Sequence, residues 1–208
     1  MKKCAGVAFV GLLAVAIVSG QELRKLSVAV GGGFTQPTGD TGHNLDLGWN
    51  IRGGVGYNFT PYVGAMVDVG FNRMGISGPT LTDLGVPGGD VQIFTATLDP
   101  IVHLNPRGRA DLYVTGGGGL YHWYQEFTAP SVAVVRVFNP FFGFFRTVIP
   151  TTDVLSSYSV NKPGVNIGGG IAFGGLRRGK FFAEARWEHI YLTGSHADFV
   201  PVTFGFRW

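Results

Sequence analysis

The stretch "VPVTFGFRW", residues Val200–Trp208, closes the chain and carries a large apolar side chain at every second position. Such strict alternation is typical of a β-strand with one apolar face. That face would carry Val200, Val202, Phe204, Phe206 and Trp208. Terminal residues usually fray unless neighbouring structure holds them. We therefore expect this strand to pair with another strand and to place its aromatic side chains against an apolar surface.

Seven further segments of the chain alternate in the same way. Each has about the 9–11 residues that cross a bilayer as a tilted strand, or somewhat more. In the third strand, for example, Val67 and Val69 fall on the apolar face and Asp68 on the polar one. In chain order the eight predicted strands are Leu26–Phe34, Leu47–Phe59, Val63–Met74, Val91–Leu104, Leu112–Phe127, Tyr158–Gly174, Phe181–Leu192 and Phe199–Trp208.

The connections between these segments alternate in length. The short ones contain Pro and Gly turn residues and are Thr60–Tyr62, Asn105–Asp111 and Gly175–Lys180. The long ones are Thr35–Asp46, Gly75–Asp90 and Thr128–Ser157, with a shorter Thr193–Asp198 on the same side. Short turns at one end and long loops at the other indicate an outer-membrane barrel with both termini on the short-turn side. The predicted fold is an all-β, eight-stranded, antiparallel up-and-down transmembrane β-barrel.

A soluble barrel of the lipocalin type would alternate as well, and the polar faces distinguish the two. A soluble barrel covers its outside with long charged side chains. Here glycine makes up 34 of 208 residues and charged residues only 14%, against about 25% in soluble domains. Small neutral residues suit the inside of a narrow barrel, so the apolar face is predicted to meet lipid. Aromatic residues near the strand ends would form the membrane girdles: Trp49, Tyr57, Phe59, Phe71, Trp123, Tyr124, Trp187 and Tyr191.

The N-terminus has the pattern of a secretory signal peptide. Met1-Lys2-Lys3 is positively charged, residues 5–18 are apolar or glycine, and Val18-Ser19-Gly20 offers small residues for cleavage. We expect residues 1–20 to be removed and residues 21–208 to form the outer-membrane barrel domain; a buried N-terminal helix is the alternative. Cleavage would also remove Cys4, the only cysteine, and with it any disulfide or cysteine metal site.

The seventh strand, "FFAEARWEHIYL", and the final "VTFGFRW" carry a resemblance to a known group. With the signal pattern and the eight-strand spacing, the chain resembles the small eight-stranded bacterial outer-membrane barrels of the OmpA-like transmembrane domain and opacity-protein class. The resemblance implies a Gram-negative outer membrane, with its lipid and lipopolysaccharide as surroundings. It also implies that Phe204, Phe206 and Trp208 are the C-terminal signal recognised by the barrel assembly machinery. Because the chain stops at the barrel, we expect no periplasmic peptidoglycan-binding domain.

Several charged residues lie on the predicted lumen face of the strands. Charges buried there must be paired or hydrated, and eight strands leave room for side chains but for no open channel. We interpret them as an ion-pair plug. The alternative is a narrow or gated pore that passes small or hydrophobic solutes. The residues are Arg52, Asp68, Asp99, Glu184, Arg186 and Glu188, to which Arg207 can be added.

Catalytic and cofactor signals are weak. Ser195, His196 and Asp198 have the residue types of a hydrolytic triad, but adjacent positions on a short loop rarely give its geometry. His189 and His196 are at most a weak metal pair. The glycine runs lack the continuation of a phosphate-binding loop and fall within strands. We therefore predict no enzyme activity, cofactor or metal, with a lipid A-modifying enzyme as the outside alternative. A small net charge without a basic stripe argues against nucleic acid.

The third long loop is unusually apolar. In "SVAVVRVFNPFFGFFRTVIP", residues 131–150, Asn139-Pro140 and Gly143 supply turn residues between two apolar arms. This pattern predicts a hairpin that continues strands five and six. A large exposed apolar patch usually marks a contact site, although packing over the barrel mouth is an alternative. The predicted contact with the outer leaflet, an extracellular protein or an apolar ligand involves Arg136, Phe138, Phe141, Phe142, Phe144, Phe145 and Arg146.

Overall fold

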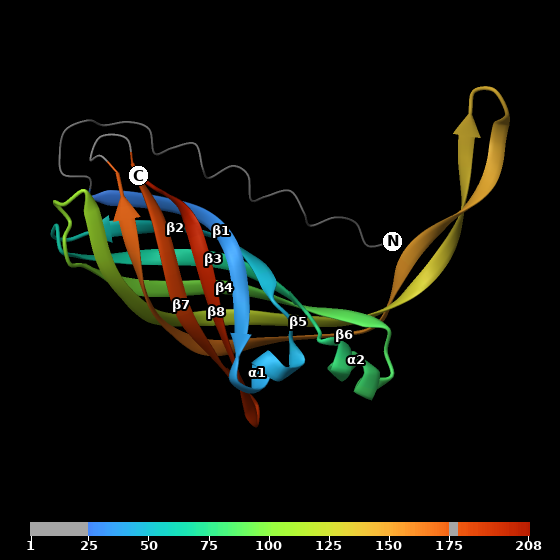
Figure 1. Ribbon diagram of the computed structural model, residues 1–208, viewed down its shortest axis with the longest axis horizontal. Helices are drawn as coiled ribbons and strands as arrows, with labels where there is room; N and C mark the ends of the chain where they lie inside the picture. The colour runs from blue at the N-terminus through green and yellow to red at the C-terminus, as the bar shows by residue number, and fades with distance from the viewer. Residues whose placement is uncertain (1–24, 175–178) are drawn as a thin grey trace.

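The computed structural model describes residues 25–174 and 179–208, which form a closed antiparallel barrel of eight strands with a long projecting hairpin (Figure 1). The predicted signal peptide, residues 1–20, lies outside the described residues. The elements in chain order are β1 (Leu26–Thr38), α1 (Gly39–Asn44), β2 (Gly48–Asn58), β3 (Val63–Gly75), α2 (Gly78–Leu84), β4 (Gly88–His103), β5 (Ala110–Asn139), β6 (Gly143–Phe173), β7 (Lys180–Leu192) and β8 (Ser195–Arg207).

The barrel closes where the last strand meets the first. β1 pairs with β2 on one side and with β8 on the other, and every other strand pairs with its neighbours in the chain. Trp208 extends this seam, because its N–H donates to the Val28 carbonyl at 2.8 Å and its carbonyl accepts from the Val28 N–H at 3.0 Å. The predicted eight-stranded up-and-down barrel is therefore confirmed, and no sheet edge remains open around the barrel wall.

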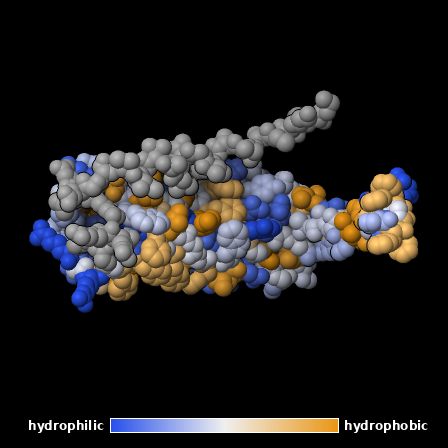
Figure 2. Space-filling view, turned by 90° about the horizontal axis from the view of Figure 1, so that it is seen from above, coloured by the Kyte–Doolittle hydropathy of each residue, from blue (hydrophilic) through white to orange (hydrophobic). Residues whose placement is uncertain are grey.

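Side chains alternate between the lumen and the outer wall as predicted. Val67 is 56% exposed, whereas Asp68 is 3% exposed. Large apolar side chains cover much of the outer wall and gather again at the hairpin tip (Figure 2).

The girdle prediction is wrong for Trp123, which is 8% exposed and points inward, since it alternates with Tyr124 along β5. Two adjacent strand residues cannot both face lipid.

The two ends of the barrel differ as expected. Short turns and the start of β1 lie near Trp208, and the opposite end carries α1, α2 and the hairpin (Figure 1). The strands at this second end are longer than predicted: the loop predicted over Thr193–Asp198 shrinks to Thr193-Gly194, with Gly194 at a φ of 81°. Two short helices occupy the first two long loops. Within the described residues no helix has the length and hydropathy of a membrane span.

Glycine permits the close approach of neighbouring strands inside the barrel. A Cβ atom on Gly33 would overlap the carbonyl oxygen of Val202, and one on Gly119 would overlap that of Ala96. Gly53 on β2 differs, because its nearest contact would be Val30 Cγ2 at 3.6 Å, an ordinary van der Waals distance. The glycine runs within the strands are therefore requirements of interior packing, at least at these positions.

We predict that Gly33→Ala destabilises the barrel by about 1–3 kcal/mol, the usual cost of overpacking. Gly53→Ala is the matched control and should change the free energy of unfolding by less than about 0.5 kcal/mol. Urea titration of the folded band on an unheated gel measures both variants. Equal midpoints for the two variants would show that β1 does not approach β8 this closely.

Candidate functional site

The barrel interior consists of three layers. The layer near the short turns is apolar and contains Ala29, Met66, Ile101, Tyr113, Ala172 and Phe182. Charged residues fill the middle of the lumen. A second and larger apolar layer lies toward the loop end and contains Leu45, Met74, Ile76, Val91, Ile93, Tyr121, Trp123, Ile190, Ala197 and Phe199. Sequence reasoning anticipated the charges but not the apolar layers on either side of them.

Arg186 is the centre of the charged layer. Its guanidinium donates to Asp68 Oδ2 at 2.9 Å and to Asp99 Oδ2 at 2.6 Å, and it also pairs with Glu184. Arg186, Asp68, Asp99 and Glu184 are each at most 4% exposed. Because these residues come from β3, β4 and β7, one cation links three strands across the lumen.

Two further cations complete the network. Arg52 on β2 pairs with Glu188 and lies 3.4 Å from Glu184 Oε1. Arg207 Nη2 is 3.9 Å from Glu184 Oε2, and its guanidinium lies 4.5 Å from the centre of the Tyr113 ring. All six charged residues expected in the lumen are thus brought together. The cavity beside them has a volume of only about 10 Å³, roughly what one water molecule occupies.

The residues that resemble a triad do not form one. Strand alternation places Ser195 and His196 on opposite faces of β8, and within the described residues no hydrogen bond joins them. Asp198 instead faces two histidines, with Oδ1 2.7 Å from His189 Nδ1 and Oδ2 3.4 Å from His196 Nε2. In residues 25–174 and 179–208 no three His, Cys, Asp or Glu side chains are grouped to hold a metal ion.

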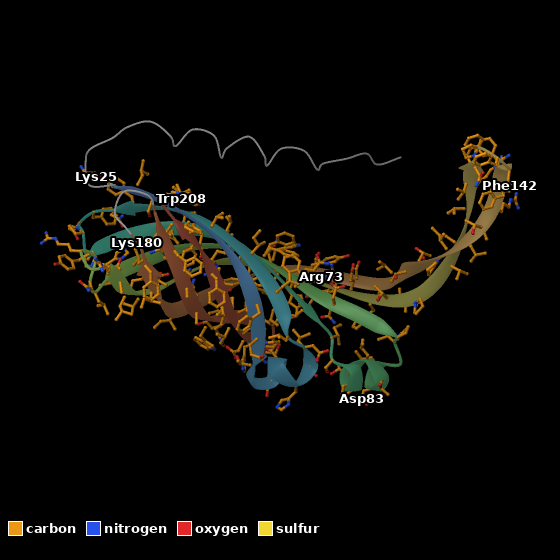
Figure 3. All side chains as sticks on the ribbon, turned by 45° about the horizontal axis from the view of Figure 1, so that its top comes forward. Lys25, Arg73, Asp83, Phe142, Lys180 and Trp208 are labelled. Atoms are coloured by element: carbon orange, nitrogen blue, oxygen red, sulfur yellow. The ribbon has the colours of Figure 1, made fainter. Side chains whose placement is uncertain are left out.

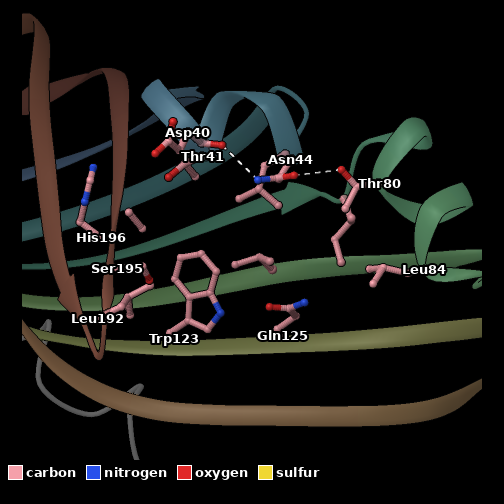
Figure 4. Close-up of a pocket in the computed structure, with 15 residues that line it drawn as sticks. Asp40, Thr41, Asn44, Thr80, Leu84, Trp123, Gln125, Leu192, Ser195 and His196 are labelled. Atoms are coloured by element: carbon pink, nitrogen blue, oxygen red, sulfur yellow. Dashed lines mark hydrogen bonds between the residues drawn. The ribbon is translucent and has the colours of Figure 1, made fainter.

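A cavity of about 490 Å³ opens at the loop end, between α1, α2 and the β7–β8 turn (Figure 4). We call it the mouth cavity. Leu45, Ile76, Val91 and Trp123 contribute to its apolar wall, and the second apolar layer lies beneath it. The sequence contained one signal for it: Val91 and Ile93 are apolar at lumen-facing positions of β4, where small or polar residues would be expected.

The apolar loop forms the predicted hairpin. Gly143 has a φ of 73° in its turn, and Phe142 lies at the end of the molecule farthest from Lys180 and Trp208 (Figure 3). Phe141 is 90% exposed and Phe142 83% exposed. We call residues 136–146 the aromatic tip. Its five phenylalanines are exposed on both strands and the turn: Phe138, Phe141, Phe142, Phe144 and Phe145.

Two arginines flank the aromatic tip. Arg136 and Arg146 occupy paired positions on β5 and β6. The Arg136 guanidinium stacks over the Phe144 ring at 4.6 Å from its centre, and the Phe138 and Phe144 rings are 5.0 Å apart. Like charges placed opposite each other on paired strands repel, so this arrangement favours an anionic group nearby.

We predict that Arg186→Met lowers the free energy of unfolding by about 3–5 kcal/mol, because it leaves three buried carboxylates without their common partner. The control is Arg73→Met. Arg73 is paired with Asp90 at 2.9 Å but is half exposed, and its loss should cost about 1 kcal/mol or less. Urea midpoints of the folded barrel measure both. An Arg186→Met midpoint no lower than that of Arg73→Met would contradict the central role of this ion-pair network.

Known proteins share this architecture. Among solved structures, Neisserial surface protein A aligns with a TM-score of 0.57 at 12% identity, over 88% of this chain and 96% of that chain. A major outer membrane protein from Thermus thermophilus aligns with a TM-score of 0.54 at 12% identity, over 88% and 98%. The attachment invasion locus protein Ail of Yersinia pestis aligns at 18% identity over 88% and 97%, with a TM-score of 0.49. At these identities the likeness concerns the fold alone.

The family of the chain is shown by its sequence and not by the solved structures. No similar sequence is found among curated proteins. The family model described as the outer membrane protein beta-barrel domain matches residues 5–208, nearly the whole chain. The chain therefore belongs to the outer membrane protein beta-barrel domain family.

Proposed function

We propose that this outer-membrane barrel is a non-enzymatic surface-interaction protein that contacts its target through the aromatic tip. The observation that carries the proposal is the exposure of five phenylalanines at the end of a projecting hairpin. Each phenylalanine would bury about 150–250 Å² on contact, so the tip has a large driving force for association.

The length of the hairpin determines where that contact takes place. The pairing of β5 with β4 ends at Thr128, and β5 continues to Asn139. Eleven further residues at about 3.3 Å each reach roughly 35 Å past the barrel rim. The lipid-facing band of such a barrel is only about 25 Å tall. The hairpin therefore supports a contact outside the hydrocarbon core that surrounds the barrel.

The chemistry of the tip supports a lipid surface that bears phosphate groups. Residues 131–150 contain Arg136 and Arg146 but no Asp or Glu. Arginine pairs well with phosphate oxygens, and apolar side chains that project from a narrow two-stranded ribbon suit a fluid lipid surface better than a flat protein face. The phosphate can belong to lipopolysaccharide or to the phospholipids of another membrane, and vesicle composition separates the two.

The barrel serves as the anchor in this proposal. Its apolar wall is surrounded by outer-membrane lipid and lipopolysaccharide, and the closed charged layer favours a structural lumen over a pore. We further propose that residues 1–20 direct export and are removed. Phe204, Phe206 and Trp208 on the closing strand would then serve as the signal for the barrel assembly machinery.

The test is flotation of the full protein, held in nanodiscs, with vesicles of three compositions: phosphatidylcholine, phosphatidylglycerol, and lipopolysaccharide with phospholipid. Replacing the five tip phenylalanines with serine should reduce vesicle binding at least tenfold, because the buried apolar area is lost. Replacement with leucine is the matched control and should retain binding. The double variant Arg136→Gln/Arg146→Gln should bind the anionic vesicles more weakly. Its binding to phosphatidylcholine vesicles should equal that of the wild type.

Each variant should still show a heat-dependent shift on a gel, which establishes that the barrel assembles. Stronger binding to lipopolysaccharide vesicles than to phosphatidylglycerol vesicles would identify lipopolysaccharide as the source of phosphate. If the wild-type protein binds none of the vesicles, or if the serine variant binds as the wild type does, the lipid contact is refuted. A phenylalanine-dependent contact with a surface protein would then take its place.

A further inference from the structure

We propose that the mouth cavity is a binding site for a small, uncharged aromatic compound that carries a carbonyl group. This site is separate from the aromatic tip, and the proposal does not depend on a lipid contact there. Its volume of about 490 Å³ falls within the usual range of small-molecule sites.

The walls of the cavity favour an apolar ligand. Ile76, Val91 and Trp123 are each at most 8% exposed and line it together. Beneath them Met74 and Ile93 are fully buried, so the floor is packed from behind and is held in shape without a ligand. A rigid apolar floor reduces the cost of ordering the site on binding.

Two side chains supply convergent hydrogen-bond donors. Trp123 is more than nine-tenths buried, yet within the described residues its indole N–H has no hydrogen-bond partner. The Gln125 side chain, two residues further along β5, likewise has no partner among the residues that the structure describes. Figure 4 shows both side chains on the same wall, with the indole nitrogen on the side of the ring toward Gln125.

The Trp123 indole N–H reaches the cavity and is not one of the polar atoms that the barrel buries without a partner. A ligand that fills the cavity would cut this donor off from water, which is costly unless the ligand supplies an acceptor, because a tryptophan N–H can only donate. A carbonyl oxygen can accept from both Trp123 and Gln125 while the rest of the ligand contacts the apolar wall. This arrangement distinguishes a ligand with a carbonyl group from a pure hydrocarbon.

The charges around the cavity favour a neutral ligand. No lysine or arginine lines it, and the carboxylate that does, Asp40, lies exposed at the rim on α1. A carboxylate or phosphate head group would find no lysine or arginine there, and His196 in the lining already faces Asp198 at 3.4 Å. Asp40 would repel such a group. Fatty acids and lipopolysaccharide phosphates are therefore poor ligands for this site.

The probe for the experiment is benzophenone, which has two aromatic rings and a carbonyl group. Under ultraviolet light its carbonyl oxygen takes a hydrogen atom from a nearby C–H, and the two resulting radicals join to form a C–C bond and a tertiary alcohol. The full protein in nanodiscs is labelled at rising benzophenone concentration, and the adducts are mapped by mass spectrometry. We expect saturable labelling on peptides that contain Leu45, Leu84 or Leu192, all of which line the cavity.

Two variants test the site itself. Leu84→Trp adds bulk at the exposed rim and should reduce saturable labelling at least tenfold. Leu112→Trp is the matched control, because Leu112 is half exposed on the barrel wall near the short turns, and it should label as the wild type does. The serine variant of the aromatic tip should also label normally. A heat-dependent gel shift confirms that each variant is folded.

Trp123→Phe tests the role of the carbonyl. In the wild type, diphenylmethane, which lacks the carbonyl oxygen, should compete with a deuterated benzophenone probe at least fivefold more weakly than ordinary benzophenone does. In Trp123→Phe that difference should shrink, because one of the two donors is gone. Three results would each overturn the proposal. Labelling could spread over the barrel wall without saturation, Leu84→Trp could be labelled as strongly as the wild type, or both compounds could compete equally in the wild type.

Discussion

Hydrogen bonding between the last strand and the first is the interaction on which the rest of the molecule depends. In hydrocarbon no water satisfies a free strand edge, so the sheet must close on itself. The Val28–Trp208 bonds extend the seam between β1 and β8 to the final residue. Once the ring is closed, strand alternation sends Val67 to lipid and Asp68 to the lumen.

Closure also explains why the interior is so tightly filled. Eight strands leave a narrow lumen, and here Arg186 binds three carboxylates between two apolar layers. A buried ion pair by itself is weak support for stability, but this one joins strands that are distant in the chain. The rigid barrel then carries two different surface features at its loop end. The mouth cavity is concave and lined by fixed side chains, whereas the aromatic tip is convex and projects away from the rim.

Much of the fold could be predicted because alternation with a period of two is a local signal. All eight strands, their order and the hairpin follow from it. The inward direction of Trp123 was missed because its neighbour Tyr124 is also aromatic, and composition alone does not assign the two faces. The added length of β5 and β6 lies beyond Thr128, where the pairing of β5 with β4 ends, and the bilayer thickness used for the prediction sets no limit there. For the mouth cavity the sequence holds one signal, the apolar Val91 and Ile93 at lumen-facing positions. Its walls could not be predicted, since they bring together α1, α2 and the β7–β8 turn, which are distant in sequence.

The inside and the outside of this closed barrel are distinguished by its apolar outer wall, which faces lipid. Spin labels placed singly at Val67→Cys, Leu98→Cys and Phe142→Cys, in protein lacking residues 1–20 and hence Cys4, measure this directly in bilayers. Collisions with oxygen, which concentrates in hydrocarbon, are compared with collisions with a water-soluble nickel chelate. We expect oxygen collisions to dominate at positions 67 and 98, and nickel chelate collisions to dominate at position 142 when no target vesicles are present. Nickel access at position 67 equal to that at position 142 would contradict it, because the wall would then face water.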